Sequence, residues 1–93
     1  MIAEDLIDYY LNNFNSSLDA TGNAAVEIPI LQSWDCVDIN NQTKIHGHLF
    51  QHHTLPPGKY LESSAIQRYF VYQGHVCVTT KDSTYRLGIP ILF

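Results

Sequence analysis

The hydrophobic pattern of this 93-residue chain changes its period once, near residue 25. Before that point apolar residues recur every three to four positions, and after it they alternate in short segments separated by turn residues. Short connections make successive strands antiparallel neighbours. We therefore predict a single α+β domain over residues 1–93, with an N-terminal amphipathic helix packed on a strongly bent antiparallel sheet or partly open small barrel of about five strands.

The predicted helix spans residues 2–18, and its two faces differ in polarity. The apolar face carries Ala3, Leu6, Ile7, Tyr10, Leu11, Phe14 and Leu18. The polar face carries Glu4, Asp5, Asp8, Asn12 and Asn15. A rotation of about 100° per residue produces this division in an amphipathic helix. The three acidic residues also lie near the N-terminus, where they complement the positive end of the helix dipole.

The strands are predicted between residues 25 and 93. Their expected ranges are 25–39, 44–53, 60–72, 76–80 and 84–88. Asn residues in 40–43 favour a turn because Asn tolerates positive φ. Pro29 cannot donate a ladder hydrogen bond, so we expect a sheet edge or a bulge there.

Charge is divided unevenly between the two halves of the chain. Residues 1–43 contain seven acidic residues and no Lys or Arg, whereas residues 44–93 contain five basic and two acidic residues, giving −7 and +3 within a net charge of −4. Charge of this kind bears on partners and not on the fold. An acidic half repels nucleic acid and favours a basic protein surface.

Four histidines lie in the segment KIHGHLFQHH, residues 44–53. In a strand His46 and His48 share one face, and His52 joins them if the strand continues, which would suit a divalent metal. Because no carboxylate lies between Asp38 and Glu62 to complete such a site, we favour a solvent-facing row of histidines. The core side of that strand would then carry Ile45, Gly47 and Leu49. A pH-dependent contact is a third interpretation.

The sequence shows no catalytic constellation. No glycine-framed nucleophile or phosphate-binding loop is present, so we expect a protein that is not an enzyme and needs no cofactor. Cys36 and Cys77 occupy apolar strand positions without metal or redox spacing, which indicates buried thiols of a cytoplasmic protein, with a disulfide between them left open. The apolar runs are far shorter than the roughly 20 residues of a membrane span.

The second half of the chain also combines basic and aromatic residues. They are Lys44, Arg68, Tyr69, Phe70, Tyr72, Lys81, Tyr85 and Arg86. On a small barrel such residues can stack bases and follow phosphates, so a nucleic-acid-binding regulator is an alternative function. The acidic balance of the whole chain disfavours it.

A hairpin pattern, V-x-T-x-x-S-x-Y-x-L-G, lies near the C-terminus. Its residues are Val78, Thr80, Ser83, Tyr85, Leu87 and Gly88, preceded by Gly58, Ser64 and Ile66. Over residues 44–90 the chain resembles the C-terminal part of small uncharacterised phage and prophage proteins. The resemblance implies a phage setting and brings no known activity.

A small acidic protein in that setting is expected to act by binding. We predict an inhibitor of a bacterial defence complex, of the anti-CRISPR type, that works in the host cytoplasm on a protein or ribonucleoprotein with a basic surface. Its contact residues would be Glu4, Asp5, Asp8, Asn12 and Asn15, with Tyr9 as the aromatic anchor. A metal-binding protein using His46 and His48 is a further alternative, and free sheet edges would allow a homodimer.

Overall fold

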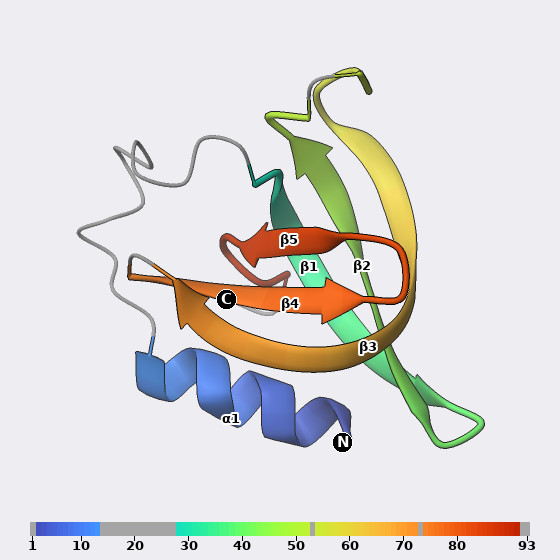
Figure 1. Ribbon diagram of the computed structural model, residues 1–93, viewed down its shortest axis with the longest axis vertical. Coiled ribbons are helices and arrows are strands. Elements are labelled where there is room, and N and C mark those ends of the chain that lie inside the picture. The colour runs from blue at the N-terminus through green and yellow to red at the C-terminus, as the bar shows by residue number, and fades with distance from the viewer. Residues whose placement is uncertain (1, 14–27, 53, 73, 92–93) are drawn as a thin grey trace.

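A computed structural model describes residues 2–13, 28–52, 54–72 and 74–91 of the chain. Its elements are α1 (Ala3–Asn13), β1 (Ile30–Ile39), β2 (Gln42–Phe50), β3 (Lys59–Tyr72), β4 (His75–Thr80) and β5 (Thr84–Leu87). The helix packs against one side of a strongly bent sheet, which confirms the predicted α+β fold (Figure 1).

The sheet follows chain order and closes into an uneven ring. Each strand is antiparallel to the next, but β5 meets β1 in parallel. Parallel closure follows from the odd number of strands, because the first and last strands of a five-strand meander run in the same direction. The closing ladder is short, with Ile30 opposite Arg86 and Leu31 opposite Leu87.

The segment after β5 extends this closure along β1. Gly88 N donates to Leu31 O at 2.8 Å, Ser33 N donates to Ile89 O at 2.8 Å, and Ile91 N donates to Trp34 O at 2.8 Å. We call this line of contact between β1 and residues 86–91 the seam. The seam covers the edge of β1 from Ile30 to Trp34, so this part of the edge is not free for the homodimer that was expected.

A bulge in β1 lies at Ser33 and not at Pro29, so its predicted position was wrong. Ser33 has a φ of 51°, and the pairing with β2 shifts between Gln32 and Asp35. Pro29 instead precedes the strand, where its missing N–H removes no ladder bond. The extra residue changes the alternation and turns Trp34 into the core.

Trp34 is the centre of the core, with 1% of its surface exposed. Its Nε1 donates to Gly88 O at 2.9 Å, and its ring meets Tyr10 edge-on at 5.1 Å. Gly47 on β2 makes room for the bulge, because a Cβ there would lie 3.0 Å from Gln32 O and 3.1 Å from the Trp34 Cα. Trp34 therefore connects the seam, the helix and β2.

Helix α1 buries Leu6 and Tyr10, as predicted. Leu11, predicted on the same face, is 49% exposed, so that assignment was wrong. The helix is rolled towards β3, and Tyr9 packs there against Tyr69 with ring centroids 4.5 Å apart. Leu11 lies on the opposite flank and is turned out by the same roll. The predicted residues Phe14, Asn15 and Leu18 lie outside the described residues.

Candidate functional site

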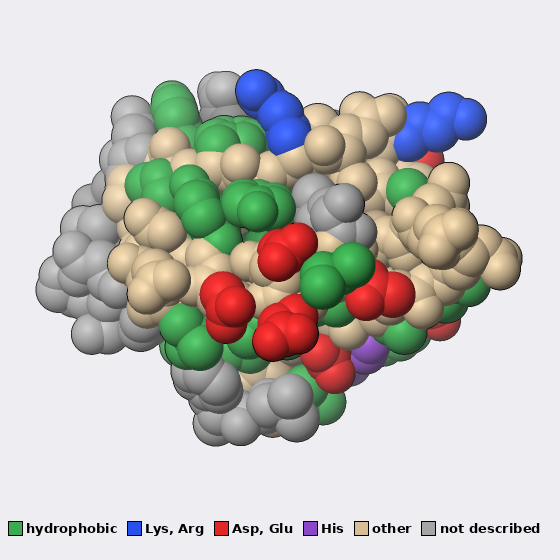
Figure 2. Space-filling model, turned by 90° about the horizontal axis from the view of Figure 1, so that it is seen from below, with side chains coloured by type: hydrophobic (Ala, Val, Ile, Leu, Met, Phe, Trp, Pro, Cys, Tyr) green, Lys and Arg blue, Asp and Glu red, His purple; other side chains and the backbone are tan. Residues whose placement is uncertain are grey.

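Acidic side chains gather on the side of the molecule that α1 covers. Glu4, Asp5 and Asp8 are all exposed there, and Asp38 of β1 is exposed near the start of the helix. Figure 2 shows acidic side chains gathered on one face, with no Lys or Arg between them. We call the four residues the acidic face. All four belong to residues 1–43, which contain no Lys or Arg.

Asp38 fixes the helix to the sheet. Its Oδ1 accepts hydrogen bonds from Ala3 N at 2.8 Å and from Thr43 Oγ1 at 2.7 Å. The first of these bonds satisfies one of the unpaired N–H groups at the start of α1. Asp38 was not among the predicted contact residues. Its parity with Trp34 and Cys36 in the strand was nevertheless a signal that its side chain lies on the same side of the sheet as theirs.

The end of β1 and the start of β2 form a projecting hairpin that includes Asp38. We call this hairpin, residues 37–42, the arm. Every residue of the arm is exposed. Asn40 and Asn41 have φ values of 53° and 63°, as expected for the Asn-containing turn predicted at 40–43. Two β-branched apolar side chains, Val37 and Ile39, remain 41% and 45% exposed on the arm.

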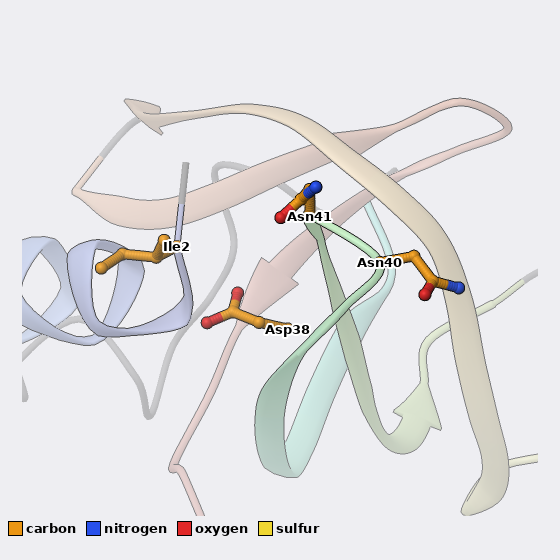
Figure 3. A pocket seen from close by; sticks show the side chains of 4 residues that line it. All are labelled: Ile2, Asp38, Asn40 and Asn41. Atoms are coloured by element: carbon orange, nitrogen blue, oxygen red, sulfur yellow. The ribbon is translucent and has the colours of Figure 1, made fainter.

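A pocket of about 650 Å³ separates the arm from the start of α1. It is lined by Ile2, Asp38, Asn40 and Asn41. Figure 3 shows the Asp38 carboxylate directed from β1 towards α1 and Ile2, with the two asparagines on the adjacent turn. The pocket therefore places a carboxylate and an apolar side chain, Ile2, between the helix and the arm.

The other predicted contact residues of the helix are distributed differently. Asn12 is exposed on α1, while Asn15 lies outside the described residues. Tyr9 is half-buried by its contact with Tyr69, so only part of its side chain is accessible to a partner. The structure thus brings Glu4, Asp5, Asp8 and Asn12 together on one helix, and it adds Asp38.

The histidine strand alternates as predicted. Its core side holds Ile45, Gly47 and Leu49, all of them buried. His46 is half-buried and His48 is exposed on the other side. Tyr60 of β3 lies beside both rings, at centroid distances of 6.0 Å from His46 and 5.7 Å from His48. These histidines contribute to the outer surface of the sheet.

His52 does not continue that row. Strand β2 ends at Phe50, and Gln51 adopts a φ of 62° that redirects the chain. His52 Nδ1 then accepts hydrogen bonds from Thr54 N and Leu55 N, both at 3.1 Å, and so stabilises the following loop. Among the described residues no group of three or more His, Cys, Asp or Glu side chains is arranged to hold a metal ion.

The basic and aromatic set divides between interior and surface. Tyr85 and Arg86 are buried, and Arg86 is held by Ile28 O, to which Nε donates at 2.8 Å, and by the Gln51 side chain. Arg68 stacks over the Phe70 ring at 4.8 Å. Of the rest of this set, Arg68, Tyr72 and Lys81 are exposed, while Lys44, Tyr69 and Phe70 are half-buried. They leave a smaller basic surface than the sequence pattern suggested.

Both cysteines are free and buried, so the thiols predicted from their strand positions are present without a disulfide between them. Burial raises the pKa of Cys36 to about 12, and the nearby carboxylates of Asp35 and Asp38 add to this effect. Burial raises the pKa of Cys77 to about 11. A thiol that stays protonated at neutral pH is a poor nucleophile and a poor metal ligand.

Comparison with known proteins gives this chain no family. No protein-family model matches it, and neither a curated protein nor a solved structure matches it. None of the helices in the described ranges has the length and apolar character required to span a lipid bilayer.

Proposed function

We propose that this protein acts by binding another protein through the acidic face. The observation that carries the proposal is the exposure of Glu4, Asp5, Asp8 and Asp38 on one side, without a basic residue between them (Figure 2). Like charges held together are costly unless a partner of opposite charge neutralises them. A partner with a basic surface supplies that charge, whereas the phosphates of nucleic acid would be repelled.

The kind of partner follows from the resemblance over residues 44–90. In a phage setting, a small binding protein with this charge acts on host machinery in the host cytoplasm. We propose an inhibitor of a bacterial defence complex, of the anti-CRISPR type, whose acidic face occupies a basic surface meant for nucleic acid. Complementary charge mainly accelerates association, and each exposed acidic residue contributes about 1 kcal/mol or less.

The test is a pair of charge reversals that change the net charge equally. Glu4→Lys/Asp8→Lys alters the acidic face, and Glu62→Lys/Asp82→Lys alters exposed acidic residues on β3 and after β4. Each pair takes the formal net charge from −4 to 0, because each reversal adds two units. Asp5 is left unchanged because its Oδ2 accepts a hydrogen bond from Ile2 N at 3.4 Å.

Both variants and the original chain are expressed in bacteria that carry an active CRISPR system and are infected with a targeted phage. The original chain and the Glu62/Asp82 variant should restore plaque formation, and the Glu4/Asp8 variant should not. A tagged pull-down should show the same pattern for components of the defence complex. Equal protection by both variants would contradict a role for the acidic face.

The alternatives predict different results. A nucleic-acid-binding regulator would bind oligonucleotides with an affinity that falls steeply with salt, and Arg68→Ala would weaken it. A metal-binding protein would be purified with stoichiometric zinc or nickel that is lost in His46→Ala/His48→Ala. Neither alternative expects a loss of binding in Glu4→Lys/Asp8→Lys.

A further inference from the structure

One edge of β3 is open beside α1. The first half of β3 pairs with β2 as far as Ala65, and the second half, from Ile66 to Tyr72, pairs with β4. Among the described residues no ladder occupies the other edge of residues 67–72, which we call the open edge. Alternate residues of an antiparallel strand direct their N–H and C=O groups away from the paired neighbour. The open edge therefore presents backbone donors and acceptors without a ladder partner.

The side chains of the open edge do not protect it from pairing. Native sheet edges are commonly blocked by Pro, by Lys or by a covering segment. Residues 67–72 contain neither Pro nor Lys. Val71 and Tyr72 are 41% and 43% exposed, and Gln67 and Arg68 are exposed as well. The open edge is thus accessible, and its β-branched and aromatic residues favour a strand.

The open edge has one side towards α1 and one side away from it. Tyr69 contacts Tyr9 of α1, so Tyr69 and Val71, two positions later, share the helix side. Arg68 stacks over Phe70 on the opposite side, with 4.8 Å from its guanidinium carbon to the ring centroid. Figure 1 shows α1 lying along this half of β3. A strand added to the open edge would therefore have α1 on one of its two sides.

The acidic face adjoins the helix side of the open edge. Asp5 is exposed and lies one turn before Tyr9, on the same stripe of α1. Every second side chain of an added strand would be directed towards this stripe. Lys or Arg at those positions would meet the carboxylate of Asp5, whereas Asp or Glu would be repelled.

We infer that the open edge binds an extended segment of another protein, rich in Lys or Arg, as an additional strand of the sheet. This inference rests on the proposed function and names the way in which a basic partner is held. Main-chain hydrogen bonds supply affinity in such complexes, and alternate side chains supply specificity. A second copy of this chain fits less well. Antiparallel pairing of two identical edges would place both helices on one side of the joined sheet and bring their acidic side chains together.

The test uses two synthetic peptides of equal length in which Lys and Val alternate. One has an ordinary backbone, and the other carries an N-methyl group on every residue, which removes its backbone donors and leaves its charge unchanged. Binding to the full chain is measured by fluorescence anisotropy at physiological salt. The ordinary peptide should bind about tenfold more tightly, a difference of about 1.4 kcal/mol. It should also protect amide groups of residues 67–72 from hydrogen exchange.

Two matched variants locate the contact. Val71→Lys places a positive charge on the helix side of the open edge, and Val37→Lys places the same charge on β1, at a valine of equal exposure, 41%. Binding of the ordinary peptide should weaken about tenfold in Val71→Lys and by less than about twofold in Val37→Lys. Amide NMR spectra of both variants verify the fold.

Equal binding of the two peptides, no binding of the ordinary peptide, or equal effects of the two variants would overturn the inference. A dimer of the chain alone, with residues 67–72 protected from exchange, would overturn the choice of occupant. The proposed function is read separately from Glu4→Lys/Asp8→Lys, which should weaken binding of both peptides. If the peptides bind equally and both respond to this reversal, only the open edge is wrong. If neither responds, the proposed function fails as well.

Discussion

The two halves of β1 differ more from each other than any two strands of the sheet. The first half, with Leu31 and Trp34, is buried and hydrogen-bonded on the seam. The second half, with Val37 and Ile39, projects from the ring with exposed apolar and acidic side chains. Buried packing is thus concentrated in one half and exposed apolar and acidic side chains in the other, with the bulge at Ser33 between them. Substitutions in the two halves should therefore have separable effects.

The largest expected effect is on the seam. Trp34→Ala should lower the free energy of unfolding by about 3–5 kcal/mol, because it leaves a cavity among the helix, β2 and the segment after β5. Urea denaturation followed by circular dichroism measures the change. Molecules that remain folded should still capture the same partner in a pull-down. A loss below about 1 kcal/mol would show that the seam is not where stability is concentrated.

Asp38→Ala should have an intermediate effect and act on both halves. Loss of its hydrogen bonds to Ala3 N and Thr43 Oγ1 should cost about 1–2 kcal/mol of stability. It should also weaken capture of the partner in a pull-down, because the start of α1 is no longer fixed to the arm. Asp38→Asn retains an acceptor oxygen and should recover most of the stability. Equal losses of stability in the two variants would indicate that the negative charge of Asp38, and not its hydrogen bonds, stabilises the fold.

A smaller effect is expected at alkaline pH. Folding raises the pKa of Cys36 from 9.0 to about 12 and that of Cys77 from 9.0 to about 11. As the pH rises, the unfolded chain therefore loses these thiol protons at a lower pH than the folded protein does. The contribution of the two thiols to the free energy of unfolding is complete below pH 9 and declines as the pH rises towards 11 and 12. Urea midpoints across this range, compared with Cys36→Ala, should show a shallower decline in the variant.

The smallest effect on stability is expected for Asp8→Asn. Asp8 is exposed and lies beyond the first turn of α1, where the helix dipole has little influence, so unfolding should change by less than about 0.5 kcal/mol. Capture of the partner in a pull-down should nevertheless decrease, because one charge of the acidic face is lost. A stability change above about 1 kcal/mol would mean that the acidic face also supports the fold.

The sequence predicts features that depend on local pattern. Alternation in the histidine strand identified Ile45 and Leu49 as core residues, and the Asn turn was recognisable because few residues accept positive φ. The helix was predicted with the right type and the right acidic residues. These features follow from side-chain polarity over a few neighbouring residues.

Features that depend on distant packing were not predictable. The bulge at Ser33 depends on Trp34 fitting against Gly47, and the roll of α1 depends on Tyr69 offering a surface to Tyr9. The bond from Ala3 N to Asp38 joins residues 35 positions apart, so no local pattern reports it. For the same reason the acidic helix could be proposed as a site from the sequence, while the place of Asp38 beside it could not.

Parallel closure of the ring has a consequence for the order of folding. The hairpins from β1 to β5 can form between neighbours in sequence, but Trp34 Nε1 reaches its acceptor, Gly88 O, across 54 positions. A contact of that separation carries a large loop entropy until the intervening strands are in place. The seam should thus close last, so an intermediate with all its hairpins formed would still expose the indole of Trp34, whose fluorescence would report completion of the ring.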